Sequence, residues 1–316
     1  MGIENEIRGI LVAQKGMNMD RRIKFRHLDA FSAIARARSF KAAAEQLHLT
    51  QPAISKTLKE LEDILGVVVM ERSRSGVSLT PEGEVFLQFA EHSTAALRQG
   101  LRSVRGAGVG AGVLRVGALP SVAASLLPAA AIAFVQTSSE TLLEVHEGPH
   151  HDLTARLRSG GLDLMVGRLG NPETMVGLSF QQLYSEQVVI VAAAGSPALG
   201  VTDFAAVDGF RVLYPPKDSA IRPLVARLLI SQGVPLFHNR IETASPAFGR
   251  AVVLADHATV WVISKGVVAA DIANGTLVPL EIDMSATLGA VGIMSRAEEV
   301  PPVATRSFSK ILNELC

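Results

Sequence analysis

The 316-residue sequence predicts a small α-helical N-terminal domain with a β-hairpin, then one long helix, then a large α/β domain. Three patterns carry this prediction. Two short amphipathic helices meet at a tight turn within residues 39–66, and a long uninterrupted helical pattern covers residues 82–105. From Val113 onward, short apolar strands alternate with helices, an order that favours open parallel sheets.

The helix pair reads SFKAAAEQLHLTQPAISKTLKELEDILG. Ser39 is placed to cap the first helix and Thr50 the second, with Pro52 in a first turn that tolerates a missing N–H. Apolar residues recur at three- and four-residue steps along the second helix and predict its buried face: Ile54, Leu58, Leu61 and Leu65. The opposite face is polar at its start and basic further on: Thr50, Gln51, Ser55, Lys56 and Lys59. This arrangement indicates a helix-turn-helix whose second helix reads base edges with its first turn and holds phosphates with later turns. We expect Ser39 and Pro52, at the starts of the two helices, to belong to the DNA-binding residues as well.

A basic hairpin follows the helix pair. Residues 67–70 and 77–80 are short apolar runs joined by a loop that contains Gly76. We expect Arg72 and Arg74 at the tip of this wing, where long cations reach a DNA backbone or a minor groove. The alternative is a plain helical hairpin with a solvated polar face, and the wing weighs against it.

These segments resemble the N-terminal module of LysR-type transcriptional regulators. The resemblance rests on RHLDAF at residues 26–31, the helix pair, and ERSRSGVSLTPEG at residues 71–83, with Met70 where the family usually has Phe. Many individual residues match the family over residues 25–104, whereas beyond them only the expected order of strands and helices is similar. Within the family, DRRIKFRHLDAF and QPAISKTLKELE are most similar to activators of protocatechuate (pca) operons. The resemblance implies promoter DNA with a dyad-like site, RNA polymerase and a small-molecule co-inducer as partners, and no enzymatic activity or other cofactor.

Composition narrows the class of protein. Hydrophobic residues make up 48% of the chain, which excludes a disordered protein, and the apolar runs are too short to span a bilayer. The single cysteine, Cys316, permits no intramolecular disulfide and fits a reducing cytoplasm. Net charge is zero, but residues 20–105 carry 14 Lys plus Arg against 10 Asp plus Glu, whereas residues 106–316 carry 14 against 18. The cationic excess therefore lies on the module expected to touch phosphates.

Residues 82–105 form the predicted linker helix. Thr80 caps it, Pro81 opens it, and its apolar residues fall near a seven-residue repeat: Phe86, Phe89, Ala90, Ser93, Ala96, Leu97, Gly100, Leu101 and Val104. We interpret this helix as the contact between the two chains of a homodimer, which sets two recognition helices roughly 34 Å apart. Two such dimers would form a homotetramer. Packing on its own domain is the alternative. The glycine-rich residues 106–112 follow a helix and precede a strand, so they predict a hinge and not a nucleotide loop.

The domain boundaries follow from these patterns. Residues 1–19 are an N-terminal extension without a secretory pattern, and residues 20–81 are the winged domain. Strands are predicted at 114–118, 141–147, 162–166, 188–194, 211–214, 260–263 and 288–295, and helices at 125–136, 151–159, 221–232, 247–256, 264–274 and 302–315. Residues 187–283 are interpreted as a second lobe, with residues 113–186 and 284–316 forming the first. Such a two-lobed α/β domain is typical of periplasmic solute-binding proteins, and the resembled family has it as its effector-binding domain, here residues 113–316.

Polar residues at strand ends and helix starts predict where a small molecule binds. The candidates are Ser121, Val122, Gly167, Arg168, Lys217, Ser219, Arg222 and Ser245. We expect their hydroxyls and cations to converge on a small organic anion between the lobes. Alternatively, each serine is only a helix cap and Arg168 only pairs with a carboxylate. The pca resemblance implies a carboxylated muconate or lactone as the effector.

Catalytic and metal sites are not predicted. His146 and His150 have Gly148 and Pro149 between them and do not share a helical face, so a loop before a helix explains them better than a metal site. Trp261 is most simply a core residue. No nucleophile has an evident base partner. Three classes remain: a ligand-responsive DNA-binding regulator, a solute-binding protein or anion-handling enzyme, and a constitutive DNA architectural protein. Only the first explains both the wing module and the α/β domain.

Overall fold

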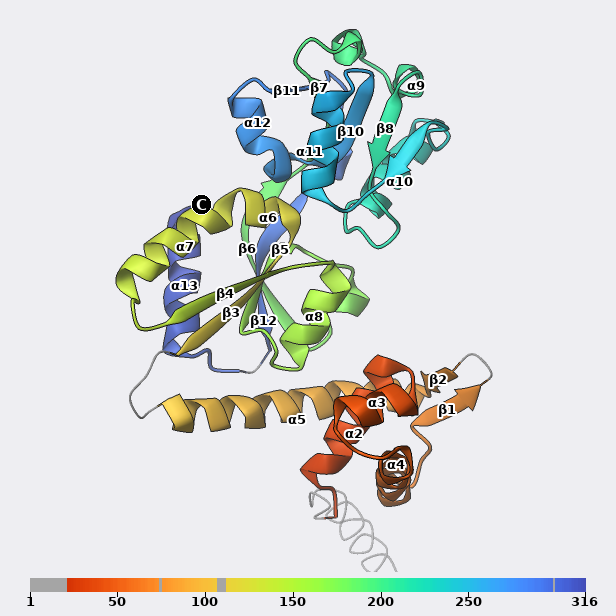
Figure 1. Ribbon diagram of the computed structural model, residues 1–316, viewed down its shortest axis with the longest axis vertical. Helices are drawn as coiled ribbons and strands as arrows, with labels where there is room; N and C mark the ends of the chain where they lie inside the picture. The colour runs from red at the N-terminus through yellow and green to blue at the C-terminus, as the bar shows by residue number, and fades with distance from the viewer. Residues whose placement is uncertain (1–21, 74–75, 107–111, 298) are drawn as a thin grey trace, which may run out of the picture. The chain divides into compact units, whose positions relative to one another are not determined.

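The computed structural model of the chain describes residues 22–73, 76–106, 112–297 and 299–316 (Figure 1). These residues form two compact units, one ending at Thr94 and the other beginning at Ala95. The predicted N-terminal extension lies outside the described residues, as do Arg74 and the middle of the predicted glycine-rich hinge.

Three helices form the core of the first unit. They are α2 (Phe25–Ala37), α3 (Phe40–Gln46) and α4 (Gln51–Leu65). Ala43 is fully buried, which allows α3 to approach its neighbours closely. The antiparallel hairpin of β1 (Met70–Ser73) and β2 (Gly76–Leu79) follows, and then α5 (Pro81–Gly106). The predicted helix pair, hairpin and long helix are therefore confirmed.

Helix α5 carries apolar residues of two kinds. Phe86 packs against Phe31 in the core of the first unit, with ring centroids 5.4 Å apart, and Ala90 is buried. Phe89, in contrast, is 66% exposed, and Leu97 and Leu101 are also exposed. Part of the predicted seam thus packs on its own domain, and another part keeps its apolar side chains on the surface.

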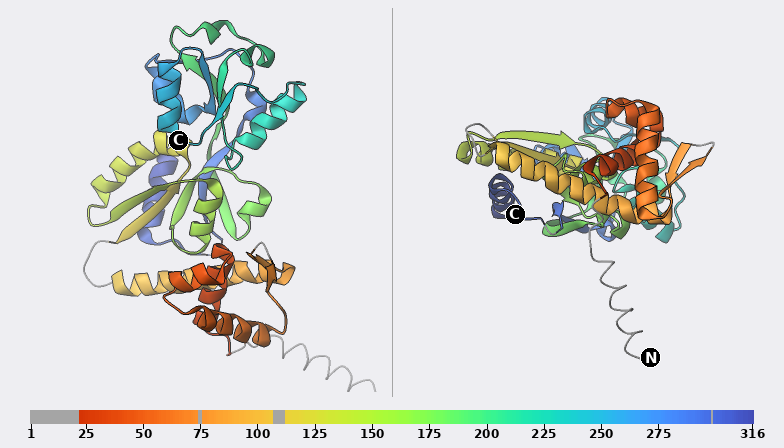
Figure 2. Two further views of the ribbon diagram at one scale, coloured as in Figure 1. Left: turned by 45° about the vertical axis from the view of Figure 1, so that its right-hand side comes forward. Right: turned by 90° about the horizontal axis from the view of Figure 1, so that it is seen from below.

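The second unit contains two lobes, each built on a five-stranded sheet (Figures 1 and 2). In lobe I the strand order is β4-β3-β5-β12-β6. Helices α7 and α13 pack on one face of this sheet and α8 on the other. The elements of lobe I are β3 (Val113–Ala118), α6 (Pro120–Ala124), α7 (Leu126–Thr137), β4 (Leu142–Glu147), α8 (His150–Arg158), β5 (Leu164–Arg168), η1 (Pro172–Met175), β6 (Leu178–Glu186), β12 (Gly289–Arg296) and α13 (Val303–Glu314).

In lobe II the strand order is β11-β7-β10-β8-β9. Successive residues of its strand β7 point to opposite faces, so Val188 and Ile190 pack with α10 whereas Val189 and Val191 pack with α11. The elements of lobe II are β7 (Val188–Ala193), η2 (Pro197–Gly200), α9 (Phe204–Val207), β8 (Arg211–Tyr214), α10 (Arg222–Ser231), β9 (Arg240–Glu242), α11 (Pro246–Ala255), β10 (Thr259–Ser264), η3 (Lys265–Val268), α12 (Ala269–Ala273), β11 (Leu277–Pro279) and η4 (Ser285–Thr287).

The sheets are mixed, whereas the order of strands and helices favoured open parallel sheets. Strand β3 pairs in parallel with β4 and β5, and β8 with β9 and β10. Each lobe also holds antiparallel strands, because β12 lies between β5 and β6, and β7 lies between β10 and β11. The physical reason is that parallel neighbours need a crossover within one lobe, whereas β7 and β12 enter their sheets directly from the other lobe. The sequence patterns also missed β6, β9 and β11.

Two chain crossings join the lobes. One leads from β6 to β7, and the other leads through η4 back to β12 in lobe I (Figure 2). The crossings are bonded to each other, because Thr287 Oγ1 accepts a hydrogen bond from the N–H of Val188 at 2.9 Å.

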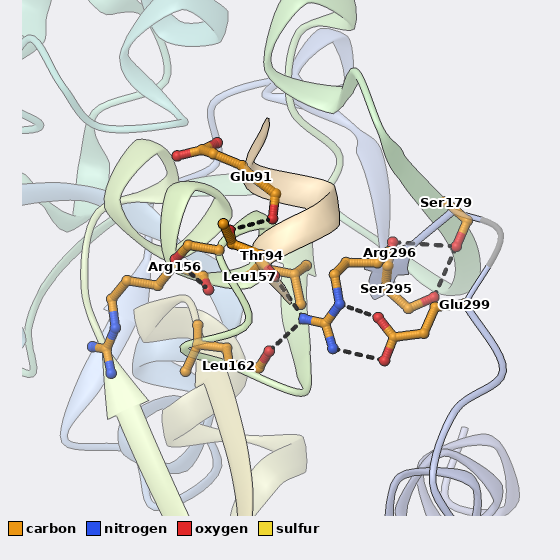
Figure 3. Close-up of polar contacts among 10 residues, drawn as sticks. Glu91, Thr94, Arg156, Leu157, Leu162, Ser179, Ser295, Arg296 and Glu299 are labelled. Carbon is orange, nitrogen blue, oxygen red and sulfur yellow. Dashed lines mark hydrogen bonds and ion pairs between the residues drawn. The ribbon is translucent and has the colours of Figure 1, made fainter. Parts of the chain in front are cut away.

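Arg296 fixes the end of β12 within lobe I (Figure 3). Its side chain is buried, and Nη1 donates hydrogen bonds to the carbonyl oxygens of Leu157 at 2.6 Å and Leu162 at 2.7 Å. The same guanidinium pairs with the carboxylate of Glu299. Since these partners all lie in lobe I, this buried cation stabilises the returning strand.

Candidate DNA-binding face and ligand cavity

The first turn of α4 is built as its sequence predicts. Thr50 caps the helix by accepting a hydrogen bond from the N–H of Ala53 at 3.4 Å, and Gln51 and Pro52 are exposed. Ser39 caps α3 in the same way, accepting from the N–H of Ala42 at 3.3 Å. Ser39 therefore stabilises the start of α3. The first turn of α4 is exposed and can be reached by a partner.

The two sides of α4 differ as expected. Ile54, Leu58 and Leu61 are buried in the core of the unit, whereas Lys56 and Lys59 are exposed. Ser55 is half-buried. Within the described part of the first unit, the polar side chains of α4 are thus left on the surface, where a basic row suits contact with phosphates.

The wing differs from the prediction at one residue. Arg72 does not lie at the tip: it belongs to β1 and pairs with Val77. Its guanidinium lies over the ring of Phe40, 4.0 Å from the centroid, and Nη2 donates a hydrogen bond to Ser55 Oγ at 3.4 Å. A cation over an aromatic face is attracted to it, so this arginine turns back toward α4.

Polar contacts fix the orientation of α4. Glu62 Oε1 accepts hydrogen bonds from the N–H groups of Val69 at 3.0 Å and Met70 at 3.4 Å, which ties the helix to the start of the wing. Glu60 bonds to Arg26 of α2 at 2.9 Å, and hydrogen bonds from Arg26 and then His27 lower the pKa of the Glu60 carboxyl. The helix is therefore held from two directions.

A cavity of about 190 Å³ lies between the lobes of the second unit. It is bordered by the end of β3 and the start of α6, by the segment that enters α8, and by the ends of β5, β8 and β10. Such strand ends are where open α/β sheets bind ligands. The cavity thus occupies the predicted position.

Three of the predicted ligand contacts line this cavity. Ser121 and Arg168 come from lobe I and Ser219 from lobe II. Arg168 is 5% exposed, and burial lowers the pKa of its guanidinium. The structure thus brings these three residues together around one cavity, and their contact with a ligand stays a prediction.

The other five predicted contacts do not line the cavity. Lys217 is exposed elsewhere, and Val122 is fully buried in the core of lobe I. Gly167 leaves room for Leu119, because a Cβ at position 167 would lie 2.6 Å from Leu119 Cγ. These three residues lie next to lining residues in the sequence without lining the cavity themselves.

Arg222 and Ser245 have structural partners instead. Arg222 pairs with Glu242 at 3.0 Å and lies over the ring of Tyr214, with its Cζ 4.9 Å from the centroid. Ser245 caps α11 by accepting from the N–H of Phe248 at 3.2 Å. For Ser245 the helix-cap alternative therefore describes what the structure shows.

Comparison with known proteins decides the family. Residues 25–84 match the bacterial regulatory helix-turn-helix domain of the lysR family, and residues 107–316 match the LysR substrate binding domain. The chain belongs to the LysR family. It is a LysR-type transcriptional regulator and not an enzyme.

Relatives of this LysR regulator are similar over almost their whole length. The HTH-type transcriptional regulator PcaQ of Agrobacterium fabrum is 43% identical over 299 residues, which are 94% of this chain and 96% of PcaQ. The uncharacterized regulator YdcI of Escherichia coli is 35% identical over 90% of this chain and 93% of its own. A full-length OxyR variant from Pseudomonas aeruginosa is 26% identical, with a TM-score of 0.61 over 92% of this chain and 94% of OxyR. The crystal structure of CbnR, 22% identical over 93% of this chain and 99% of CbnR, shares the fold with a TM-score of 0.56.

Several cavity residues of the LysR regulator escaped prediction. Trp261, interpreted as core, is buried and also lines the cavity, as do Thr243 and Ser264. His150, interpreted as part of a loop before a helix, opens α8 and lines the cavity with its side chain buried. The sequence could have indicated His150, because it lies between the end of a strand and the start of a helix. Trp261 lies in an unbroken apolar run, and no sequence pattern marks it as a cavity residue.

Two further features bear on the LysR regulator. Within the described residues, no group of three His, Cys, Asp or Glu side chains is arranged to hold a metal ion. Of the helices that the structure describes, none is long and apolar enough to cross a membrane.

Proposed function

We propose that this LysR regulator activates an operon for the catabolism of an aromatic acid of the protocatechuate type, in response to a small organic anion. The observation that carries this proposal is the 43% identity with PcaQ across nearly the whole of both chains. The cavity between the lobes supports the small-molecule part, since it offers Arg168, Ser121 and Ser219 to a ligand.

The proposed mechanism uses both units. Two copies of the chain, paired through α5 as a homodimer and assembled as a homotetramer in the cytoplasm, place their α4 helices on a site with partial dyad symmetry. Ligand binding favours one arrangement of the two lobes, because the cavity takes residues from both. The resulting change in the spacing or bend of the DNA alters contact with RNA polymerase.

A reporter assay tests this function. The DNA upstream of the operon adjacent to the regulator's own gene drives the reporter, and candidate acids are added to the cells. We expect 3,4-dihydroxybenzoate or one of its ring-opened products to increase expression in the presence of the wild-type regulator. Arg168→Met should abolish the response, whereas Arg227→Met, at an arginine outside the cavity, should preserve it.

The possible results distinguish the pathway, the target DNA and the direction of regulation. Protection of the upstream DNA without a response to any aromatic acid would show a LysR regulator of another pathway. Absence of any binding to that DNA would contradict the choice of target. Higher expression without the regulator than with it, when no acid is added, would show a repressor in place of an activator.

A further inference from the structure

The cavity is small and has flat walls. Its volume of about 190 Å³ is below the range of about 300–1,000 Å³ that is common for pockets of drug-sized ligands, which favours a small organic acid. Trp261 in lobe II and His150 in lobe I, two residues with flat side chains, both line it. Aromatic faces pack best on ligands that are themselves flat.

Two residues that line the cavity also have a buried polar atom without a partner. His150 is 8% exposed, and its Nε2 has no hydrogen-bond partner among the described residues. Burial, followed by the charges of Arg158 and His151, lowers the pKa of His150, which favours the neutral ring. Arg168, the one arginine or lysine of the described lining, also keeps its Nε unbonded. Both nitrogens are closed to solvent, so these residues act on a ligand through charge and polarity and not through a hydrogen bond from these two atoms.

A glycine lies directly behind the indole. Gly249 is an interior residue of α11, where glycine is a poor helix former, so its presence calls for a reason. A Cβ at position 249 would lie 2.5 Å from Cζ2 and 2.6 Å from Cε2 of Trp261. Because the same indole lines the cavity, a methyl group at position 249 would displace the cavity wall.

The imidazole has a similar support. A Cβ at Gly170 would lie 2.6 Å from Nε2 of His150 and closer still to Cε1. Both flat side chains of the cavity thus lie back against a residue without a Cβ. The absence of a Cβ at these two glycines therefore helps to determine the width of the cavity between Trp261 and His150.

Resting on the proposed function, we propose that the cavity selects a flat, conjugated carboxylate, and that Gly249 determines its size by seating the indole of Trp261. Two kinds of ligand have this chemistry: an aromatic acid, and the conjugated acid that forms when such a ring is opened. A saturated acid of equal charge is thicker and packs poorly against these walls.

Calorimetric titration of the full-length protein tests both parts of the proposal. The probes are 3,4-dihydroxybenzoate and cis,cis-muconate, each compared with its saturated counterpart, 3,4-dihydroxycyclohexanecarboxylate and adipate. We expect at least one conjugated acid to bind, with its saturated counterpart weaker by roughly tenfold or more. Trp261 is the only tryptophan of the chain, so its fluorescence should change on binding.

The variants isolate the glycine. Gly249→Ala should weaken binding of the conjugated acid by roughly tenfold or more. Gly200→Ala is the matched control in the same lobe, because a Cβ there meets nothing within 4 Å, and it should bind as the wild type does. The double variant Gly249→Ala/Trp261→Phe should recover binding, since the smaller ring leaves room for the new methyl group. It also keeps the test decisive if Gly249→Ala alone fails to fold.

Three results would overturn the inference. Equal binding of saturated and conjugated acids would refute selection for flatness, and equal binding by Gly249→Ala and Gly200→Ala would refute the role of the glycine. Failure of all four probes, with induction by another effector intact, would refute the ligand class while the proposed regulatory function stands. Loss of DNA binding by the wild type would instead refute that function.

Discussion

Arg168 donates hydrogen bonds to both chain crossings between the lobes: Nη2 to the carbonyl oxygen of Glu186 at 2.8 Å and Nη1 to that of Thr287 at 3.2 Å. Its guanidinium also lies 3.8 Å from the Glu186 carboxylate, and both side chains are buried. Burial raises the pKa of the Glu186 carboxyl. A hydrogen bond from Ser121 and the charge of Arg168 lower it again in part. One residue thus lines the ligand cavity and joins the crossings.

Replacing Arg168 should therefore affect stability as well as induction. Arg168→Met leaves the Glu186 carboxyl buried without its cation, which we expect to lower the free energy of unfolding by about 3–5 kcal/mol. Urea denaturation followed by Trp261 fluorescence measures this loss. Arg168→Met/Glu186→Gln should recover part of it, and no recovery would show that the carbonyl contacts dominate. Arg227→Met should have no effect.

His150 should make the protein less stable in acid. Its pKa in the folded protein lies below the ordinary value of 6.5, so its contribution to stability is full above that pH and is lost as the pH falls through the lowered pKa. Thermal denaturation between pH 8 and pH 5 should show a smaller acid loss for His150→Gln than for the wild type. His257→Gln, at an exposed histidine of lobe II, should follow the wild type. Identical curves for all three proteins would contradict this role of burial.

Lys59 should contribute to DNA affinity without reading sequence. Its side chain is exposed in the third turn of α4, and Lys59→Ala should weaken specific and random DNA alike. The slope of log K against log salt should fall by about 0.9 for each lost phosphate contact. Titrations at several salt concentrations measure it. An unchanged slope would mean that Lys59 touches no phosphate.

Two phenylalanines of α5 should behave differently. Phe89 is 66% exposed, so Phe89→Ser should leave the fold intact and weaken self-association, which analytical ultracentrifugation detects. Phe86 packs on Phe31, so Phe86→Ser should destabilise the first unit by about 3 kcal/mol or more. If Phe89→Ser self-associates as the wild type does, the exposed side of α5 is not the dimer contact.

Local chemistry made much of the first unit predictable. Thr50, Pro52 and the apolar steps from Ile54 to Leu61 specify the start and buried side of α4 without help from distant residues. Arg72 was misplaced because its position depends on Phe40, which lies far away in the sequence. Register within the hairpin cannot be inferred from two short apolar runs.

The ligand cavity was less predictable for a similar reason. Strand ends identify where a cavity forms, and Ser121, Arg168 and Ser219 were found in this way. The direction of each side chain depends on packing: Arg222 turns to Glu242. Trp261 lies in a continuous apolar strand, and only the folded structure shows that it lines the cavity.

The antiparallel strands also lay beyond sequence patterns. Periodicity identifies β12 as a strand, but its place between β5 and β6 follows from the return of the chain to lobe I. That return is a contact between residues more than a hundred positions apart, such as Arg296 and Leu157.

The central claim is that the exposed first turn of α4 reads DNA sequence, and competition gel-shift assays with Gln51→Ala test it most directly. The labelled fragment is the DNA upstream of the adjacent operon, and the competitors are single base-pair variants of the protected site. Wild-type protein should discriminate by about 1–3 kcal/mol at the base pair that Gln51 contacts, and Gln51→Ala should lose this discrimination at that position alone. Equal discrimination by both proteins at every position would contradict the account.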